Sequence, residues 1–308
     1  MHRMLIAARR HPQADLPLET SAGVTAAFLR RVAVAWVLCA ALPAAGQDPG
    51  KKDNDAGPYV PTPWVIVDEM LKLADIRPGD VVYDLGSGDG RLVITAAKRF
   101  EARGVGIELK PELVALASAS AEKEGVADRV KFVRGDLFET DIREATVITL
   151  YLLPQYVTRL VPRFRAELRP GTRIVSHDYP LLPWPPEKDF TMEVPEKEFI
   201  SGMTTTHLYY YVVPARIGGQ WELSLPGALA RAPLSLEVNQ ELHFTGGLAS
   251  DGNSEDYLRD MKVLGENVSF RLLYNGKMMV FEGTAAGDTM AGEVSSRGVR
   301  GPWTAKRR

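Results

Sequence analysis

The chain has 308 residues, more than one average domain needs, and its 45% hydrophobic and 25% charged residues are ordinary for a globular protein. The formal net charge is -2 at pH 7 and the basic residues are interspersed with acidic ones, which argues against a nucleic acid as partner. The one cysteine, Cys39, lies in an apolar N-terminal stretch. A mature chain without that stretch would have no thiol, which excludes a disulfide framework, a thiolate metal site and a cysteine nucleophile.

The N-terminus has the pattern of an export signal. The basic pair Arg30-Arg31 precedes an apolar run over residues 32–45, and small and then polar residues follow it. This run is shorter than the roughly 20 residues of a membrane span. We therefore expect residues 1–46 to be a cleaved signal, which makes the protein periplasmic or secreted. The alternatives are an uncleaved membrane anchor formed by residues 32–45, and a cytoplasmic or organelle-targeting segment. Residues 47–57 are polar and are expected to form a linker.

From residue 58 the pattern alternates between helices and strands. The expected helices are 63–74, 91–100 and 111–124, and the expected strands are 81–85, 104–109, 131–133, 146–152 and 173–177, with a further pair around 198–203 and 206–212 that closes the sheet. Strands and helices that alternate at this pitch predict a Rossmann-like, doubly wound α/β sheet over residues 58–214. In such a sheet the ligand lies beyond the carboxyl ends of the strands, so the residues that follow each strand are the candidates for a site.

A glycine-rich loop, DLGSGDG, follows the first expected strand. Its glycines are Gly86, Gly88 and Gly90. Glycines let the backbone turn tightly and approach a ligand closely. Arg91 stands where a dinucleotide-binding loop has its third glycine, and Asp84 and Asp89 flank the loop. Carboxylates disfavour a phosphate and favour a cationic ligand that carries an amino group and a sulfonium. The alternative is a glycine turn with a purely structural role.

Three further side chains follow the next strands. Glu108 ends the second strand, where a carboxylate can accept both hydroxyls of a ribose; the alternative is a solvated loop charge. Asp136 follows the third strand and could accept from an adenine amino group; capping a helix is a compatible alternative. Tyr151 follows the fourth strand and would face a methyl group and its acceptor; the alternative is a tyrosine buried in the core.

Together these residues resemble the S-adenosylmethionine (SAM)-dependent methyltransferases. The segments PYVPTP, VVYDLGSGDGRLVITAAK, GDLFETDI, ATVITLYLLP and LRPGTRIVSHDY resemble the archaeal broad-specificity protein-lysine methyltransferase family. They also resemble its mitochondrial relatives, which methylate a carrier protein and the ATP synthase c-subunit. The motif at residues 58–63 is far less common than the glycine loop, so it carries most of this assignment.

The resemblance implies SAM as the sole cofactor, no metal, and the ε-amino group of protein lysines as acceptor. The residues expected to contact the cofactor are Tyr59, Thr62, Asp84, Gly86, Gly88, Gly90, Glu108 and Asp136. Tyr59 and Thr62 are expected to close over it from the N-terminal side. Tyr151 and Pro154 match the segment beside the acceptor, and His177-Asp178 the segment after the fifth strand. Tyr59, Tyr151 and Asp178 are the catalytic candidates.

The acceptor lysine must be neutral to attack a methyl group, and a free lysine has a pKa near 10.4. A narrow aromatic channel lined by Tyr59, Tyr151 and Trp184 would lower that pKa by desolvation and would tolerate the methylated cation. Asp178 could relay the departing proton outward. His177 is more typical of a structural hydrogen-bonding residue than of a catalyst.

Residues 217–308 read as a separate, small antiparallel barrel or sandwich. Its expected strands are 221–225, 234–240, 241–247, 261–265, 268–274, 277–285, 288–294 and 302–307. Asn275-Gly276 is a hairpin turn signal. We expect Trp221 and Trp303 to close the core of this domain, and His243 to be an ordinary strand residue.

Three functions fit these observations. The first is a methyltransferase for protein lysines, whose partner is a protein and which meets a membrane only through an uncleaved N-terminal segment. The second is a methyltransferase for a small-molecule, lipid or envelope acceptor. The third is a non-catalytic exported scaffold, because SAM is made in the cytosol. Against this last hypothesis, all the expected carboxylates and loop glycines are present.

Overall fold

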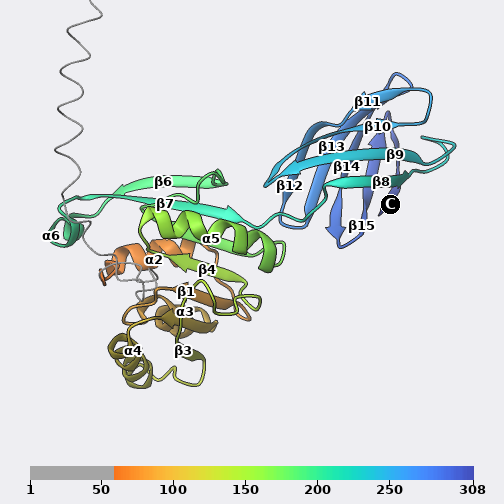
Figure 1. Cartoon of the computed structure of the whole chain (residues 1–308). Coiled ribbons are helices and arrows are strands. Elements are labelled where there is room, and N and C mark those ends of the chain that lie inside the picture. Colours follow the sequence, from red (N-terminus) through yellow and green to blue (C-terminus); the bar gives the residue numbers. More distant parts are fainter. Residues whose placement is uncertain (1–58) are drawn as a thin grey trace, which may run out of the picture. The chain divides into compact units, whose positions relative to one another are not determined.

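The computed structural model describes residues 59–308, which form two sheets (Figure 1). The predicted export signal or anchor at residues 1–46 and the predicted linker at 47–57 lie outside the described residues. Within residues 59–308, none of the helices combines the length and the apolar character that a bilayer crossing requires.

The first sheet is mixed and has seven strands. They are β1 (Val81–Leu85), β2 (Arg103–Glu108), β3 (Val130–Arg134), β4 (Val147–Leu150), β5 (Arg173–His177), β6 (Lys188–Glu193) and β7 (Thr205–Val212). The strand order is β3-β2-β1-β4-β5-β7-β6. Strands β1 to β5 are parallel, and β7 runs antiparallel to both β5 and β6. This is the predicted doubly wound sheet, and its order reverses between β1 and β4, where such sheets bind ligands.

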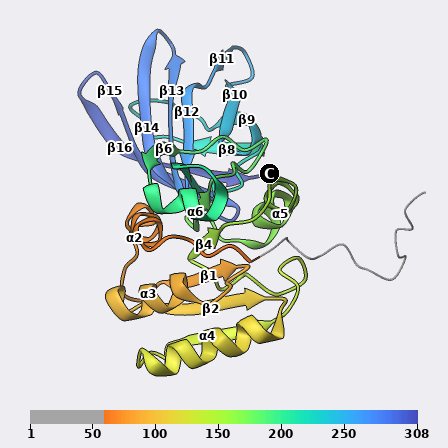
Figure 2. The ribbon, with the colours of Figure 1, turned by 90° about the vertical axis from the view of Figure 1, so that its left-hand side faces the viewer.

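Helices cover both faces of this sheet (Figure 2). They are α2 (Trp64–Leu73), α3 (Arg91–Phe100), α4 (Pro111–Lys123) and α5 (Pro154–Glu167), followed by the 3-10 turn η1 (Pro195–Lys197) and the short α6 (Glu198–Ser201). The sequence prediction missed α5. Its signals were Pro154 at the first helical position and buried side chains at helical spacing, which are Tyr156, Val157, Leu160, Val161 and Phe164.

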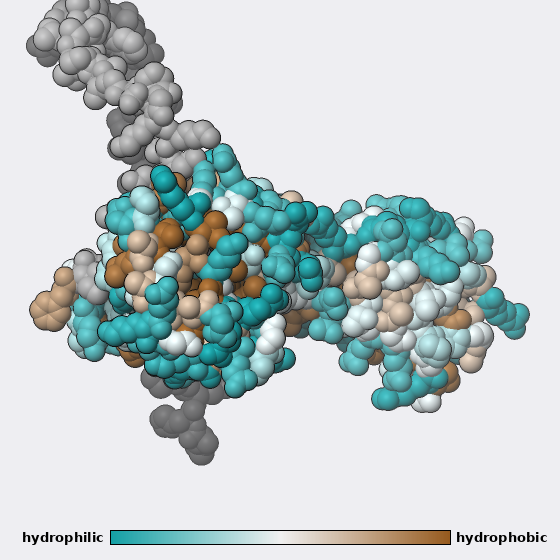
Figure 3. All heavy atoms as spheres, turned by 90° about the horizontal axis from the view of Figure 1, so that it is seen from below, coloured by the Kyte–Doolittle hydropathy of each residue, from teal (hydrophilic) through white to brown (hydrophobic). Residues whose placement is uncertain are grey.

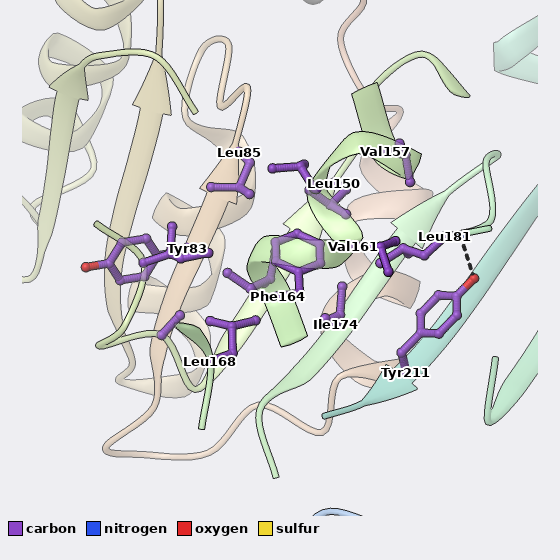
Figure 4. Close-up of a cluster of buried hydrophobic side chains, with 14 of the residues drawn as sticks. Tyr83, Leu85, Leu150, Val157, Val161, Phe164, Leu168, Ile174, Leu181 and Tyr211 are labelled. Carbon is purple, nitrogen blue, oxygen red and sulfur yellow. Dashed lines mark hydrogen bonds between the residues drawn. The ribbon is translucent and has the colours of Figure 1, made fainter. Parts of the chain in front are cut away.

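Strand β1 shows how the two faces are filled. Tyr83 and Leu85 pack in one cluster with α5, where Phe164 is fully buried (Figure 4). Val82 points to the opposite face and packs in a second cluster with α2 and α3. Because alternate residues of a strand face opposite sides and both sides are covered, every residue of β1 is buried.

The predicted strand around residues 198–203 is wrong. Those residues contain α6, and the strand that pairs with β7 is β6. Pro195 begins the 3-10 turn that ends the extended chain, and Gly202, at φ 72°, ends the helix. Phe190 and Met192 alternate with exposed residues along β6 and pack on the cluster that α2 and α3 form. This alternation was the missed signal.

The second sheet is antiparallel and has nine strands. They are β8 (Gly219–Ser224), β9 (Leu234–Glu241), β10 (Phe244–Ser250), β11 (Glu255–Tyr257), β12 (Arg259–Leu264), β13 (Asn267–Tyr274), β14 (Lys277–Ala286), β15 (Thr289–Ser296) and β16 (Val299–Arg307). The order is β11-β10-β9-β8-β16-β15-β14-β13-β12. Thr245 of β10 donates a hydrogen bond of 3.0 Å to the carbonyl of Met261 in β12, so the two ends of the sheet meet and the sheet is a nearly closed barrel.

The interior of the barrel is packed with aromatic side chains. Phe270 and Phe281 stack with ring centroids 4.3 Å apart, and Trp303 meets each of them edge-on at 5.7 Å. Trp221 is fully buried and donates to the carbonyl of Ile217 at 2.8 Å. The prediction that Trp221 and Trp303 close this core is confirmed.

Turn residues account for the differences from the predicted barrel strands. Asn275 and Gly276 have φ values of 51° and 69°, as in the predicted hairpin turn. His243, however, lies in the turn between β9 and β10 rather than in a strand, because Leu242 takes a φ of 57° that interrupts the extended chain. The three-residue strand β11 was not predicted.

The end of the first sheet that carries the amino termini of β1 and β5 is held by a buried charge network. Asp80 accepts hydrogen bonds from Arg173, from the Thr146 hydroxyl at 2.7 Å and from the Arg77 N–H at 2.7 Å. Arg173 also donates to the carbonyls of Ala74 and Asp75, which follow α2. Burial by itself would raise the pKa of Asp80, but the hydrogen bonds from Arg173 and Thr146 outweigh it and hold the pKa below 3.8.

We expect Asp80→Asn to lower the free energy of unfolding by about 2 kcal/mol at pH 7, because it leaves Arg173 without its buried counter-charge. A carboxyl with a lowered pKa stabilises the fold fully above its ordinary pKa and loses that contribution as the pH falls through the lowered value. The difference between wild type and variant should therefore shrink as the pH falls below 3.8. Urea unfolding at pH 7, 5 and 3 measures it, with the exposed Asp128→Asn as control. A constant difference would contradict the assignment.

Candidate functional site

A cavity lies at the carboxyl ends of β1, β2 and β4, where the strand order reverses. Its lining brings together most of the residues predicted from the sequence, which are Tyr59, Thr62, Asp84, Gly86, Gly88, Glu108, Asp136 and Tyr151. Among the described residues, Gly90 and Asp178 were predicted for the site and do not line the cavity. An added Cβ at Gly90 would lie 2.4 Å from the Phe132 ring, so this glycine serves the packing of α3 on the sheet.

The glycine loop is fixed by the neighbouring strand and by the N-terminal segment. The N–H groups of Gly86 and Ser87 both donate to the carbonyl of Ile107, at 2.9 and 3.0 Å. Gly88 has a φ of 53°, and an added Cβ there would lie 2.4 Å from Cε2 of Tyr59. Both the backbone angle and the close approach of the Tyr59 ring therefore require glycine at position 88.

Glu108 is fixed by two backbone hydrogen bonds. Its Oε2 accepts from the N–H of Gly88 and its Oε1 from the N–H of Lys110, each at 3.0 Å. The side chain is 9% exposed and lines the cavity. Each carboxylate oxygen can accept a second hydrogen bond, so the group can hold a pair of ligand hydroxyls without moving.

Asp84 is the most deeply buried carboxyl of the cavity, at 3% exposure. Its Oδ1 accepts a hydrogen bond of 2.7 Å from the hydroxyl of Thr149 in β4. Burial raises the pKa of Asp84 to about 7; the Thr149 hydrogen bond opposes this rise, and the charges of Asp89 and Glu108 add to it. A cationic ligand would remove this electrostatic cost, so the site is suited to a positively charged amino group.

Asp136 lies in the turn that follows β3 and lines the cavity. Its Oδ1 accepts from the N–H of Phe138 at 2.8 Å, and the Thr140 hydroxyl donates to its backbone carbonyl at 2.7 Å. The residues that follow form a turn rather than a helix, so Asp136 orders a loop instead of capping a helix.

Arg91 ties residues 59–62 to the glycine loop. Its guanidinium donates to the carbonyl of Thr62 at 2.6 Å, pairs with Asp89 at 2.6 Å and lies over the Trp64 ring. The Tyr59 side chain hydrogen-bonds with the same Asp89–Arg91 pair; its pKa is raised by burial and by the Asp89 charge. From the sequence, Arg91 is recognisable only as a departure from the dinucleotide-binding pattern. Its role could not be predicted, because Thr62 and Arg91 come into contact only in the folded chain.

Tyr151, which follows β4, also lines the cavity. Its ring stacks on His177 with centroids 3.9 Å apart, and its hydroxyl hydrogen-bonds with Asp178. Burial and the Asp178 charge raise the pKa of Tyr151, so the phenol is neutral at pH 7. Burial lowers the pKa of His177 to about 4, against the opposing charge of Asp178, so the imidazole is neutral as well. Asp178 thus reaches the cavity through Tyr151.

Two residues expected beside the acceptor lie elsewhere. Trp184 is fully buried against Tyr211, with ring centroids 5.5 Å apart, so the expectation that it lines the channel is wrong. The sequence offered no signal for this, because a tryptophan after the last parallel strand fits a channel or a core equally well. Pro154 is the first residue of α5, where its ring suits the helix start.

The half of the chain that contains the first sheet is similar to known proteins. Residues 84–188 match the family model of the ANTKMT methyltransferase domain. Over 157 residues the chain is 43% identical to a protein-lysine N-methyltransferase of Saccharolobus islandicus, covering 51% of this chain and 93% of that relative. Over 129 residues it is 38% identical to the adenine nucleotide translocase lysine N-methyltransferase of Mus musculus, covering 42% of this chain and 56% of that relative.

Solved structures also match. A crystal structure described as an RNA methyltransferase from Salinibacter ruber in complex with S-adenosyl-L-homocysteine is 49% identical, with a TM-score of 0.46. The match covers 51% of this chain and 96% of that one.

We expect Gly88→Ala to weaken SAM binding at least tenfold, because the added methyl displaces the Tyr59 ring from the cavity. The matched control is Gly79→Ala. Gly79 has a comparable backbone angle, φ 90°, but nothing lies within 4 Å of an added Cβ. The control should lower stability by about 1 kcal/mol and leave the affinity unchanged. Calorimetric titration with SAM measures both. Equal affinities of the two variants would refute the role of the close approach.

The affinity for SAM should fall about tenfold between pH 8 and pH 6. The ligand's amino cation needs the ionised form of Asp84, and this carboxyl takes up a proton as the pH falls through about 7. Titrations at pH 6, 7 and 8 test this, together with Asp84→Asn, which should bind weakly at every pH. A wild-type affinity that does not vary over this range would show that Asp84 is already ionised in the free protein.

Proposed function

The chain belongs to the family of SAM-dependent protein-lysine methyltransferases, and from this we propose that it transfers the methyl group of SAM to lysine ε-amino groups of another protein. The observation that carries the proposal is the convergence of Asp84, Glu108 and Tyr151 on one cavity at the switch point of the sheet.

The cavity residues fit SAM by their chemistry. The buried carboxyl of Asp84 suits the amino group, the fixed carboxylate of Glu108 suits the two ribose hydroxyls, and Asp136 suits the adenine amino group. When bound, SAM supplies an activated methyl group on a positively charged sulfur. The residues of the chain then align the reactants and exclude water, which is where catalysis of such a displacement originates.

The acceptor amine must reach the cavity without its extra proton. As the nitrogen–carbon bond forms, the sulfur–carbon bond breaks, and the proton given up by the lysine ammonium goes to solvent. The half-buried Tyr151 and the buried Leu152 offer the amine an uncharged wall that favours its neutral form. This wall contains no ionised group of its own, since burial keeps the Tyr151 phenol neutral.

The surface around the cavity supports a macromolecular acceptor. Tyr59 and Leu109 line the cavity and are also 39% and 40% exposed, and Leu153, next to the lining residue Leu152, is 37% exposed. These three residues define the apolar rim; Figure 3 shows more generally that apolar side chains are exposed on one face of this part of the chain. An apolar rim favours a protein surface over a small polar metabolite.

Residues 1–46 support a further proposal, that the protein is exported and that its acceptors are envelope or extracellular proteins. Mass spectrometry of the mature chain tests it. A start within a few residues of Gln47 would support export, whereas an intact segment over residues 32–45 would favour a membrane anchor.

The test of the proposed function uses the purified protein, tritium-labelled SAM and an envelope extract. The extract is then separated into protein, nucleic-acid, lipid and small-molecule fractions, and the labelled protein is hydrolysed to amino acids. We expect the label in methyllysine. Label in another fraction would refute lysine as the acceptor, and absence of label with SAM bound would favour a non-catalytic scaffold.

A pair of variants ties the activity to the cavity. Glu108→Ala should reduce methyl transfer at low SAM concentration by at least tenfold, because the fixed carboxylate is lost. The control is Glu112→Ala, an exposed glutamate in the first turn of α4, which should retain wild-type transfer. Equal transfer by both variants would place the cofactor elsewhere.

A further inference from the structure

A lysine buried behind the acceptor side of the cavity has no place in the function described so far. Lys197 ends the 3-10 turn η1 and is 1% exposed. Its ammonium lies 2.7 Å from Asp178 Oδ1 and donates to the carbonyl of Thr205 at 2.8 Å. A fully buried lysine is rare in proteins, because desolvating its charge is costly unless an anion compensates for it.

The anion, Asp178, is the centre of a network drawn from several elements. It follows β5 with a φ of 63°, a strained angle for a non-glycine residue. Besides Lys197 of η1, its carboxylate faces the backbone N–H of His207 in β7 at 3.2 Å and the imidazole of His177 in β5 at 3.5 Å. The remaining partner is the hydroxyl of Tyr151, which follows β4.

Tyr151 is the member of this network that lines the cavity. A hydroxyl that donates its proton to a carboxylate has only oxygen lone pairs left for another partner. Such an oxygen can accept an N–H of an incoming amine and orient it, and it cannot compete for the lone pair of the amine. The stacking of the Tyr151 ring on His177 restricts the rotation of the phenol.

We propose that Lys197 is a positioning residue: its ion pair with Asp178 fixes that carboxylate as the acceptor of the Tyr151 hydroxyl, which leaves the phenol oxygen free to accept an N–H of the substrate amine. This inference rests on the proposed function for the identity of the amine. A buried ion pair can often be replaced by apolar side chains of similar volume without loss of stability. The positioning role therefore gives the Lys197–Asp178 pair a function beyond stability.

Lys197→Met removes the ammonium and keeps a side chain of similar length. Asp178 then lacks the ion-pair partner that fixes its carboxylate, and Tyr151 loses an acceptor held in a defined position. Carbon-13 NMR of ring-labelled tyrosine in the full chain reports this directly, with the Tyr151 signal assigned by its absence in Tyr151→Phe. We expect that signal to be displaced in Lys197→Met relative to the wild type at the same pH.

Steady-state methyl transfer gives the second readout. Lys197→Met and Tyr151→Phe should each lower kcat about tenfold and leave the Kd for SAM within twofold of wild type. The double variant should be no slower than Tyr151→Phe, since both changes remove one interaction. Lys72→Met, at an exposed lysine of α2, is the matched control and should retain the wild-type kcat.

The two readouts separate the possible failures. An unchanged Tyr151 signal in a folded Lys197→Met overturns the inference whether or not methyl transfer is observed. A displaced signal together with an unchanged kcat overturns the catalytic part of it. If the wild type transfers no methyl group to lysine, the proposed function fails, and the NMR signal still decides whether Lys197 controls Tyr151. Should Lys197→Met not fold, Lys197→Met/Asp178→Asn removes both charges and must displace the same signal.

Discussion

Two buried carboxyl groups, those of Asp84 and Glu108, lie in one cavity at the carboxyl ends of β1 and β2. The unfavourable free energy of burying them together is the constraint on which the rest of the site depends. Asp84 is the penultimate residue of β1 and Glu108 ends the neighbouring strand β2; the charges of Asp89 and Glu108 add to the burial that raises the pKa of Asp84. Neutral donors offset this unfavourable free energy only in part: the Thr149 hydroxyl donates to Asp84, and the Gly88 N–H donates to Glu108. A cationic ligand with hydroxyl groups supplies what is missing, which is the physical basis for assigning SAM to this cavity.

The N-terminal segment over residues 59–62 depends on the same arrangement. Arg91 binds Thr62 and Asp89 together, so the segment is held against the glycine loop by one guanidinium. The close packing of Tyr59 on Gly88 then shapes the wall of the cavity. Because a guanidinium forms several hydrogen bonds in fixed directions, one residue suffices to join these two stretches of chain.

The wall of the cavity that contains Tyr151 is built differently. Here the aromatic ring of Tyr151 faces the cavity, and the charges lie behind it, as a buried pair formed by Lys197 and Asp178. Neither member of this pair lines the cavity, while the hydrogen bond from Tyr151 to Asp178 still orients the polar end of the ring. The second sheet closes around its own aromatic core.

Local patterns in the sequence determined much of this protein. Buried strands such as β1 and β5 are short apolar runs bounded by turn residues, and their observed limits equal the predicted ones. The glycine loop and the carboxylates that follow strands could be predicted because the carboxyl ends of parallel strands necessarily lie together. The aromatic closure of the barrel by Trp221 and Trp303 follows from the burial that large side chains require.

Only the tertiary structure decided the pairings between distant segments. Residues 188–193, and not residues 198–203, pair with β7. Pro195 ends the extended chain, and Phe190 and Met192 pack on the hydrophobic core of the sheet. The contacts from Arg91 to Thr62 and from Lys197 to Asp178 could not be predicted from the sequence. Most arginines and lysines are solvated, so nothing in the sequence distinguishes these two from the others. Burial gives these charges their roles, and burial is a property of the packed chain that no local pattern encodes.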